Sequence, residues 1–383
     1  MAVRGDARAG AETEETTLDQ AHVRPRVVTR CCTTSALTPT LTPQVISLIR
    51  RLLPSSATPS ADAEAAGETL WDLSAAQEHV PLLLHNSLPR AAAAALLHDD
   101  PPASGRLQEE LLGCLANLAA CGFAQALADD SAVVLAVVGA GLCGSSDPAA
   151  LAEACRCLRA AVSCGAAGEA WRAALHGTDG ARERAVSLLG SALHAPAVRQ
   201  AADLVSSLWL AGSSRERAAL LNAGALPAAL AALAALPRLG GGDVHAAADA
   251  AARCVEAIAS DSAAVPGLAE TLADGSLQAA LLPLLAQAEA APALAASASI
   301  VLASVMAALQ EAAAGDDEAA AVAATNAIVA LLQALAADGD ALAAAQAIAD
   351  DSGWVGGGDA AAQEAAAELL AVLRASTCDA PDG

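Results

Sequence analysis

Residues 107 to 121 read LQEELLGCLANLAAC, and apolar side chains recur in them every three or four positions. Such spacing places the apolar side chains on one face of a helix, where they can pack against a core. The stripe consists of Leu107, Leu111, Cys114, Leu118 and Cys121. The segment LAEACRCLRAAVSC, at 151–164, has a stripe of the same kind. Both segments are therefore expected to be amphipathic helices.

The two helices align when one is moved by 43 residues along the chain. The aligned pairs are Cys114 with Cys157, Leu115 with Leu158, Cys121 with Cys164, and Gly122 with Gly165. Comparable helices are expected at 201–212, 248–260, 295–309 and 324–337. A period in the forties is typical of armadillo and HEAT arrays, where each unit buries its apolar faces against its neighbours. The sequence therefore predicts an all-α fold, an armadillo/HEAT-like α-solenoid wound as a right-handed superhelix.

The composition agrees with a helical, core-forming chain. Of the 383 residues, 55% are hydrophobic and only 16% are charged, which excludes a disordered protein. Alanine is abundant, and alanine is the best helix former. The expected organisation is a disordered N-terminal tail (1–42), an N-terminal helix (43–53), a linker (54–63), an armadillo-like repeat domain (64–376) and a disordered C-terminal tail (377–383).

The charge is unevenly distributed along the chain. The net charge is −23, and the segment 221–383 has 20 acidic residues against three arginines. The segment 150–220 has eight arginines against six acids. Nucleic-acid binding needs a basic footprint, so this balance argues against it. The acidic half is interpreted either as a solvated surface or as a docking face for basic peptides.

The ten cysteines and seven histidines do not have the spacing of a metal site. The chain contains no C-x-x-C pair and no H-x-x-x-H, so no metal or other cofactor is expected. Buried, reduced thiols acting as small hydrophobes are the better interpretation, and they favour the cytoplasm or nucleus. The N-terminal tail contains Arg and Thr as a transit peptide would, but Glu12, Glu14, Glu15 and Asp19 weaken that interpretation, which leaves organelle import open.

A glycine-rich stretch, VVLAVVGAGLCGSS at 133–146, has the G-x-G-x-x-G spacing of a nucleotide-binding loop at Gly139, Gly141 and Gly144. Such a loop needs a strand before it and a helix that starts within it. The next helix is instead expected to start at Pro148, capped by Ser146 or Asp147. We therefore expect 132–143 to be a helix with Gly144 as its C-terminal cap. A nucleotide-binding enzyme is the less favoured alternative.

Two stretches are similar to armadillo repeats. The phrase NAGALPAAL, within 220–236, is similar to the recurrent armadillo junction and predicts one helix ending at Asn222 to Gly224 and another starting near Pro227. The phrase GCLANLAAC is similar to the third armadillo helix, in which an asparagine holds an extended peptide in a groove. This resemblance implies that role for Asn117; an internal hydrogen bond is the alternative, and both remain open.

The order of several short elements between 43 and 236 resembles the serum amyloid A-like 1 family of armadillo-type proteins. The matching positions are Trp71, Asp72 and Ser74 in W-D-x-S, Asn117 and Cys121 in N-x-A-C, and Asp147 with Pro148 in S-D-P. The chain departs from the family at Ala116, where glycine is preferred. The resemblance implies a protein of nucleus or cytoplasm that lacks catalytic activity, acts through protein contacts and is linked in animals to cell proliferation.

The expected function is therefore a non-enzymatic protein-binding scaffold, monomeric, with protein partners of unknown identity, for which basic peptides are one candidate class. Candidate binding residues are Asn117, Trp71 and Asp72, although Trp71 is also interpreted as a core aromatic, like Trp209, and Asp72 as the cap of the following helix. Membrane and nucleic acid are not expected partners. The alternative is a membrane-associated helical protein, because uncharged runs such as 290–310 are long enough to span a bilayer.

Overall fold

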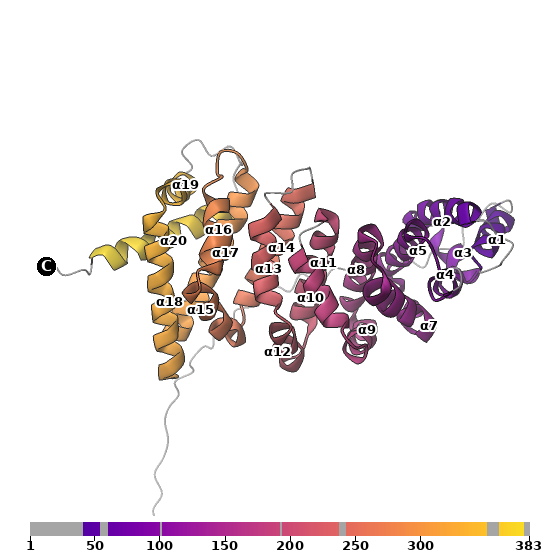
Figure 1. Ribbon diagram of the computed structural model, residues 1–383, viewed down its shortest axis with the longest axis horizontal. Coiled ribbons are helices and arrows are strands. Elements are labelled where there is room, and N and C mark those ends of the chain that lie inside the picture. The colour runs from indigo at the N-terminus through magenta and orange to yellow at the C-terminus, as the bar shows by residue number, and fades with distance from the viewer. Residues whose placement is uncertain are drawn as a thin grey trace, which may run out of the picture.

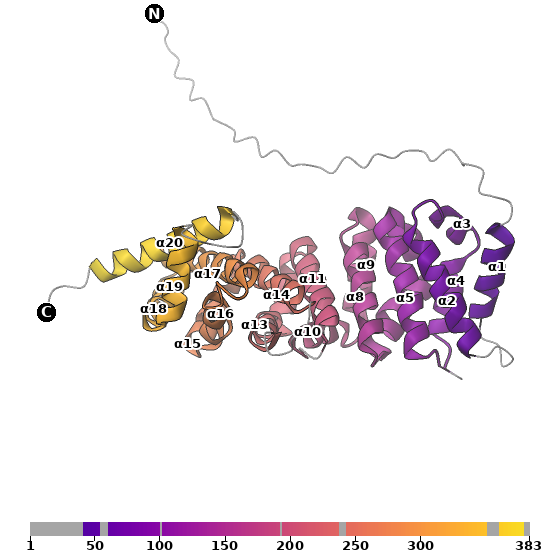
Figure 2. The same cartoon turned by 90° about the horizontal axis from the view of Figure 1, so that it is seen from above.

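The computed structural model describes residues 41–53, 60–99, 102–191, 194–236, 243–350 and 360–378. Within these ranges the regular structure is helical, and no β-strand occurs; an isolated bridge pairs Asp99 with Pro102. The all-α class predicted from the sequence is confirmed. The helices lie in an elongated row that runs from α1 to α20 (Figures 1 and 2).

The helices have the following bounds. They are α1 (Leu41–Leu52), α2 (Ser60–Ala75), α3 (Val80–His85), α4 (Leu88–Leu96), α5 (Gly105–Leu118), η1 (Ala119–Phe123), α6 (Ala124–Ala128), α7 (Ser131–Leu135), η2 (Ala136–Gly144), α8 (Pro148–Val162), α9 (Gly165–Gly177), α10 (Ala181–Ser191), α11 (Ala195–Ala211), α12 (Ser214–Asn222), α13 (Ala225–Ala235), α14 (Asp243–Ala259), η4 (Ser262–Ala264), α15 (Val265–Ala273), α16 (Ser276–Leu285), α17 (Pro292–Ala313), α18 (Glu318–Ala337), α19 (Gly339–Ala349) and α20 (Ala360–Cys378). Segments η1 and η2 are π-helices and η4 is a 3₁₀ turn.

Each helix packs mainly on helices that lie a few elements away along the chain. The long helices α2, α5, α8, α11, α14, α17 and α20 form one line, in which each packs on the next. A second line is formed by α4, η2, α10, α13, α16 and α19, again each against the next. The helices therefore follow one another in groups of three, such as α9, α10 and α11. In each group, the last helix belongs to the first line and the middle helix belongs to the second line.

The buried interior consists mainly of alanine and leucine, with Trp171 and Trp209 as its largest buried side chains. Alanine and glycine let neighbouring helices approach closely. At Gly113, for example, a Cβ atom would lie 2.5 Å from Cε2 of Trp71, so the indole occupies the space that a side chain on α5 would need. Close packing of this kind supplies the dispersion contacts that stabilise a core.

Local signals determine several helix boundaries, as the sequence predicts. Asp147 caps α8 by accepting hydrogen bonds from the backbone N–H groups of Ala149 and Ala150, both at 2.9 Å, and Pro148 is the first helical residue. Helix α12 ends at Asn222 and α13 begins at Ala225. Gly224, between them, has φ of 85°, a left-handed conformation that glycine adopts without strain.

The outer boundaries differ from those predicted. Helix α1 begins at Leu41, two residues before the expected start, and α2 begins at Ser60, inside the expected linker. Helix α20 extends to Cys378, into the expected C-terminal tail. The predicted tails at 1–40 and 379–383, and the predicted linker at 54–59, lie outside the described residues.

The glycine-rich stretch is helical, because α7 covers 131–135 and η2 covers 136–144. The strand that a nucleotide-binding loop requires is therefore not present at this position. The prediction that Gly144 is the C-terminal cap is wrong by one residue: η2 runs through Gly144, and its C-cap is Ser145, which has an extended backbone. Gly141 is in close contact with two helices, since a Cβ there would lie 2.9 Å from Cδ2 of Leu112 and 3.3 Å from Cβ of Ala154.

Candidate functional site

Asn117 lies in the last turn of α5 and joins three helices of the first line. Its Nδ2 donates to Oγ of Ser74 on α2 at 2.9 Å, and its Oδ1 accepts from Nη1 of Arg156 on α8 at 2.8 Å. Ser74 is fully buried and donates to the carbonyl of Trp71 at 2.7 Å. Since an amide nitrogen has two N–H groups, Asn117 retains one donor beyond these contacts. The site therefore supports an internal role and still offers one donor to a ligand.

Arg156 completes the network around Asn117. Its Nη2 donates to the carbonyl of Gly113 at 3.2 Å, and its Nε donates to Oε2 of Glu153 at 2.7 Å. The guanidinium thus bridges α5 and α8 while its charge is balanced on its own helix. Arginine suits this task because its planar group offers several donors in fixed directions.

The polar contacts continue along the first line toward the C-terminus. Arg159 on α8 contacts Asp203 on α11 at 3.2 Å, and Asp203 contacts Arg253 on α14 at 3.3 Å. Arg253 also pairs with Asp249 on its own helix, and Asp249 accepts from Oγ of Ser297 on α17 at 3.0 Å. We call this set the polar ladder; its members are Ser74, Asn117, Arg156, Arg159, Asp203, Asp249, Arg253 and Ser297. Because these pairs are partly exposed, each contributes at most about 1 kcal/mol, so the ladder orients the helices more than it stabilises them.

Trp71 lies half-buried between α2 and α5. One part of its ring packs on the backbone at Gly113, and the guanidinium of Arg106 lies 5.8 Å from the ring centroid. The geometry suits a cation–π contact, which is worth about 0.5–1 kcal/mol at an exposed site. Trp71 therefore acts in helix packing, as the interpretation as a core aromatic expects, and it keeps a partly exposed edge beside Asn117's helix.

Glu110 is a buried carboxylate close to Trp71. Its Oε1 lies 2.8 Å from Nε of Arg106, whereas its Oε2 has no hydrogen-bond partner and faces Gly67 on α2. Burial raises the pKa of Glu110 to about 7; Arg106 opposes this shift, and the carboxylates of Glu68 and Glu64 add to it. A carboxyl in this environment changes charge near neutral pH.

Asp72 is exposed and lies within α2, which continues to Ala75. The prediction that Asp72 caps the following helix is therefore wrong. Helix α3 begins at Val80, its N-cap is His79, and no side chain caps it. The apolar face of α2, which includes the buried Leu70, carries the helix past Asp72. As a protein-binding candidate, Asp72 contributes an exposed charge on the same helix as Trp71.

A pocket of about 650 Å³ lies near one end of α14, α15, α17 and α18. Its apolar lining includes Val265, Pro266 and several alanines, and the carboxylates of Glu311, Asp316 and Asp317 also line it. The full lining comprises Ala259, Ser260, Ser262, Val265, Pro266, Ser304, Ala307, Ala308, Glu311, Ala312, Gly315, Asp316, Asp317 and Ala320. We call it the acidic pocket. It can accept an apolar group that is accompanied by positive charge.

Of the polar ladder, the sequence motifs include only Asn117 and Ser74, and they include no residue of the acidic pocket. The acidic excess of 221–383 was a signal for the pocket, but it did not indicate which carboxylates lie together. For the ladder, the signal was a recurrence of polar residues about forty positions apart. Ser74 and Asn117, for example, are 43 residues apart.

Seven cysteines between 114 and 254 are free thiols: Cys114, Cys121, Cys143, Cys155, Cys157, Cys164 and Cys254. Burial raises the pKa of Cys114, Cys155, Cys157 and Cys254 to about 12, so these thiols stay protonated at neutral pH. Groups of three or more His, Cys, Asp or Glu side chains arranged to hold a metal ion do not occur in the described ranges.

Three of the described helical stretches are long and apolar enough to cross a membrane: 105–128, 292–313 and 318–337. In the first two, 56% and 61% of the apolar window is buried by packing against other helices. In the third, which is α18, only 28% is buried, and Val322 and Val329 are 56% and 46% exposed. Helix α18 therefore presents an apolar surface that the rest of the described chain does not cover.

Comparison with known proteins assigns no family to the chain. No protein-family model matches it, and no curated protein matches it at a significant level.

Proposed function

We propose that the protein is a non-enzymatic scaffold that binds protein partners through an armadillo/HEAT-like α-solenoid, wound as a right-handed superhelix. The two lines of helices support this architecture, because successive helices within each line pack on one another. Residues that hydrogen-bond between successive long helices of the ladder are separated by 39, 43, 44, 48 and 50 positions. These separations scatter around the length of armadillo and HEAT units, which is about 40–47 residues.

The backbone at two aligned glycines gives further support to a repeat. Gly122 and Gly165, which the 43-residue shift superimposes, have φ of 92° and 44° and follow α5 and α8 respectively. At both positions the backbone turns at a left-handed glycine a few residues after a long helix. Left-handed glycines commonly follow the ends of helices. The same local solution at both positions is what a repeated unit would produce.

The resemblance to the serum amyloid A-like 1 family enters the proposal at two of its elements. Ser74 of W-D-x-S and Asn117 of N-x-A-C are hydrogen-bonded to each other. This hydrogen bond gives a structural reason for W-D-x-S and N-x-A-C to occur together in the motif order of that family. On that resemblance we propose a monomer of nucleus or cytoplasm with a role connected to cell proliferation.

The acidic pocket is the observation that carries the binding proposal. It has room for several side chains and offers both apolar and anionic surface. We propose that a basic peptide segment docks there, with an apolar side chain in the pocket and cationic side chains at Glu311 and Asp316. Asp317 is less available, because it caps α18 by accepting from Ala319 and Ala320.

The polar ladder has a second part in this proposal. Armadillo proteins hold peptides along the face of their third helices, and the ladder lies on the corresponding helices here. Asn117 contributes one amide donor that its internal contacts leave over. A peptide that reached Asn117 would need this donor.

The binding proposal is tested with a short fluorescein-labelled peptide in which pairs of Leu and Arg alternate. Fluorescence anisotropy measures its affinity for the wild type and for Glu311→Gln/Asp316→Asn, which removes two charges and keeps the shape. We expect binding about three- to tenfold weaker in the variant, since exposed charges contribute up to about 1 kcal/mol each.

The matched control is Glu270→Gln/Glu289→Gln, which removes two exposed carboxylates elsewhere in the same half of the chain. It should bind the peptide like the wild type, apart from a small effect of net charge. Equal weakening in both double variants would show that only the overall charge attracts the peptide, and the pocket would then have no specific role.

Association with a membrane is a second candidate function, and the exposed apolar face of α18 is the observation that favours it. Flotation with neutral phosphatidylcholine vesicles tests it, with Val322→Asp/Val329→Asp as the comparison. Flotation of the wild type that the variant loses would favour membrane association. Absence of the wild type from the vesicle fraction would remove this candidate.

A further inference from the structure

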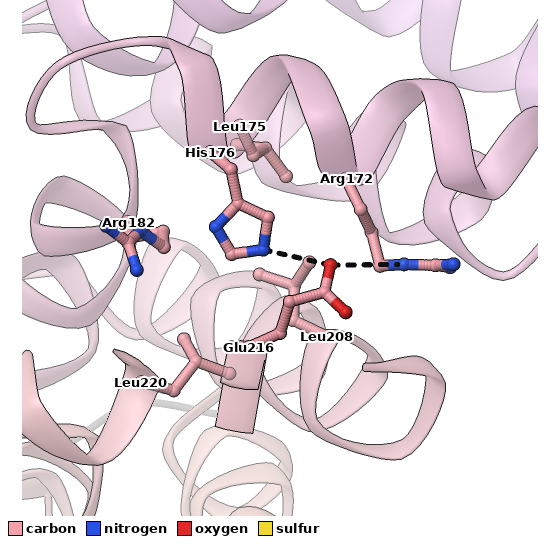
Figure 3. Close-up of a pocket in the computed structure, with 7 residues that line it drawn as sticks. All are labelled: Arg172, Leu175, His176, Arg182, Leu208, Glu216 and Leu220. Atoms are coloured by element: carbon pink, nitrogen blue, oxygen red, sulfur yellow. Dashed lines mark hydrogen bonds and ion pairs between the residues drawn. The ribbon is translucent and has the colours of Figure 1, made fainter. Parts of the chain in front are cut away.

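A second pocket lies between α9, α10 and α12, in the part of the chain that is richest in arginine (Figure 3). Arg172 and His176 come from α9, Arg182 from α10, and Arg215 and Glu216 from α12. We call these five residues the basic pocket. Neither the polar ladder nor the acidic pocket includes any of them.

The basic pocket has an excess of positive charge in a strongly acidic protein. Three guanidinium groups line it, and Glu216 is the sole acidic residue of its described lining. The chain as a whole has a net charge of −23, with 43 acidic residues against 20 basic ones. Abundant carboxylates elsewhere make the local excess of cations a specific feature of this place.

The carboxylate of Glu216 is already fully engaged by the protein. Its Oε2 accepts from the backbone N–H of Ser213 at 2.6 Å and from its hydroxyl at 2.8 Å, in the capping box that starts α12. Its Oε1 lies 2.9 Å from Nε2 of His176 and 3.7 Å from Nε of Arg172. Burial raises the pKa of Glu216, but the hydrogen bonds from Ser213 and His176 outweigh it, and the net shift is downward. Glu216 is therefore ionised and has no oxygen to spare for the other two arginines.

Arg182 and Arg215 lack a close anionic partner. The ion pair of Arg182 with Glu183 is 3.9 Å long, and Arg215 makes no hydrogen bond or ion pair with the described residues. Packing nevertheless restrains the side chain of Arg182, because only 26% of it is exposed. Figure 3 shows Arg182 and Arg172 on opposite sides of His176, whose second ring nitrogen lies on the side of Arg182.

The shape of the basic pocket limits what it can bind. Its inner part, whose lining includes Leu175, Leu208 and Leu220, has a volume of about 10 Å³. This is room for no more than one water molecule. Its outer part, lined by His176, Arg182, Arg215, Glu216 and Ala219, has about 360 Å³ and opens to the surface. A small anionic head group fits the outer part, whereas an organic ligand that required deep burial does not fit the inner one.

We propose that the basic pocket binds a phosphate monoester dianion, with Arg182 and Arg215 as the principal ligands. Three arginines against one glutamate leave two positive charges, which a dianion neutralises and a single carboxylate does not. Guanidinium groups match the oxygens of phosphate in pairs, which makes arginine clusters common binding sites for phosphorylated side chains. The site is separate from the acidic pocket, so this proposal does not depend on the scaffold's binding to basic peptides.

The proposal is tested by isothermal titration of the full chain with three probes. They are inorganic phosphate, a short alanine-rich peptide with one phosphoserine, and the same peptide with glutamate in place of phosphoserine. We expect both phosphate probes to bind and the glutamate peptide to bind at least about tenfold more weakly. A phosphopeptide that binds more tightly than inorganic phosphate identifies a phosphorylated partner as the source; equal affinities identify a free phosphate compound.

Arg182→Gln/Arg215→Gln should weaken phosphate binding by about tenfold or more, because charge-assisted hydrogen bonds to phosphate are lost. Neither side chain makes a hydrogen bond or a close ion pair within the described protein. The variant should therefore retain the wild-type circular dichroism spectrum and melting temperature. The control, Arg50→Gln/Arg199→Gln, removes two exposed arginines outside the pocket and should bind as the wild type does.

Arg182→Lys/Arg215→Lys should restore part of the affinity, since it restores charge but not the paired hydrogen bonds. Equal binding of the glutamate peptide, or unchanged phosphate binding in Arg182→Gln/Arg215→Gln, would overturn the proposal. So would an equal loss of binding in the control variant.

Discussion

Replacing Glu110 by glutamine should stabilise the protein at alkaline pH and remove part of its pH dependence. Glu110 is 1% exposed, and its pKa is raised to about 7 in the folded chain, mainly by burial. The unfolded chain has the ordinary pKa of 4.5. Between these values the folded state binds more protons than the unfolded state, so stability falls as the pH rises through this range.

The size of the effect follows from the shift in pKa. Since one unit corresponds to 1.36 kcal/mol, the ionised Glu110 costs about 3 kcal/mol once the pH exceeds 7. Roughly 2 kcal/mol of this cost develops between about pH 5.5 and 8.5, because part of it is already present at the lower pH. Glutamine imitates the protonated carboxyl, and its oxygen can still accept from Arg106, so Glu110→Gln avoids the cost of the buried charge.

Urea unfolding followed by circular dichroism at about pH 5.5 and 8.5 measures the effect. The gain of Glu110→Gln over the wild type should be larger at the higher pH by about 2 kcal/mol. Glu109→Gln is the matched control, because Glu109 also pairs with Arg106, at 2.8 Å, but is more exposed. A pH dependence of Glu110→Gln that equals that of the wild type would refute a buried carboxylate with a raised pKa.

Three further perturbations follow from the packing. Gly141→Ala should destabilise the protein by about 1–3 kcal/mol in urea unfolding, because its methyl group would meet Leu112. Gly139→Ala should be neutral or stabilising by up to about 1 kcal/mol, and a less stable Gly139→Ala than Gly141→Ala would contradict the packing described. Asn117→Ala should lower the free energy of unfolding by about 1–3 kcal/mol, because it leaves donors of Arg156 and the Ser74 hydroxyl without their partner; an unchanged melting temperature would show that Asn117 is not structural. The fully buried cysteine thiols should react with iodoacetamide at pH 8 only on unfolding, and mass spectrometry of fast labelling in the native state would contradict their burial.

The helices and several of their boundaries could be predicted because local chemistry determines them. The cap at Asp147, the first-turn proline at Pro148 and the left-handed Gly224 are each recognisable within a few residues of sequence. The apolar stripe of 107–121 likewise depends only on spacing within one helix. The all-α class follows from such signals.

The contacts between helices could not be predicted, since they depend on residues far apart in the chain. Gly141 looks like an unfavourable residue in a helix, yet the approach of Leu112 and Ala154 from α5 and α8 leaves no room for a methyl group. The partners of Asn117 lie 43 residues before it and 39 residues after it. Neither neighbour is implied by the sequence around Asn117 itself.

Asp72 shows how a local signal can mislead. Aspartate is a favoured N-cap residue, so Asp72 resembles a helix start. Here the buried face of α2, with Leu70 and Ser74, extends past Asp72 and keeps it inside the helix. Burial of that face outweighs the preference of one exposed side chain, because tertiary packing supplies most of the stability of a helix.

Hydrogen exchange measured by mass spectrometry, with and without the Leu/Arg peptide, tests the proposed scaffold function most directly. Bound peptide should slow exchange at the η4–α15 segment around Val265 and at the α17–α18 turn around Asp316, which together line the acidic pocket. Protection there should be weaker in Glu311→Gln/Asp316→Asn at a peptide concentration near the dissociation constant of the wild type. Absence of protection in the wild type, or protection confined to other helices, would contradict a peptide-binding role for this pocket.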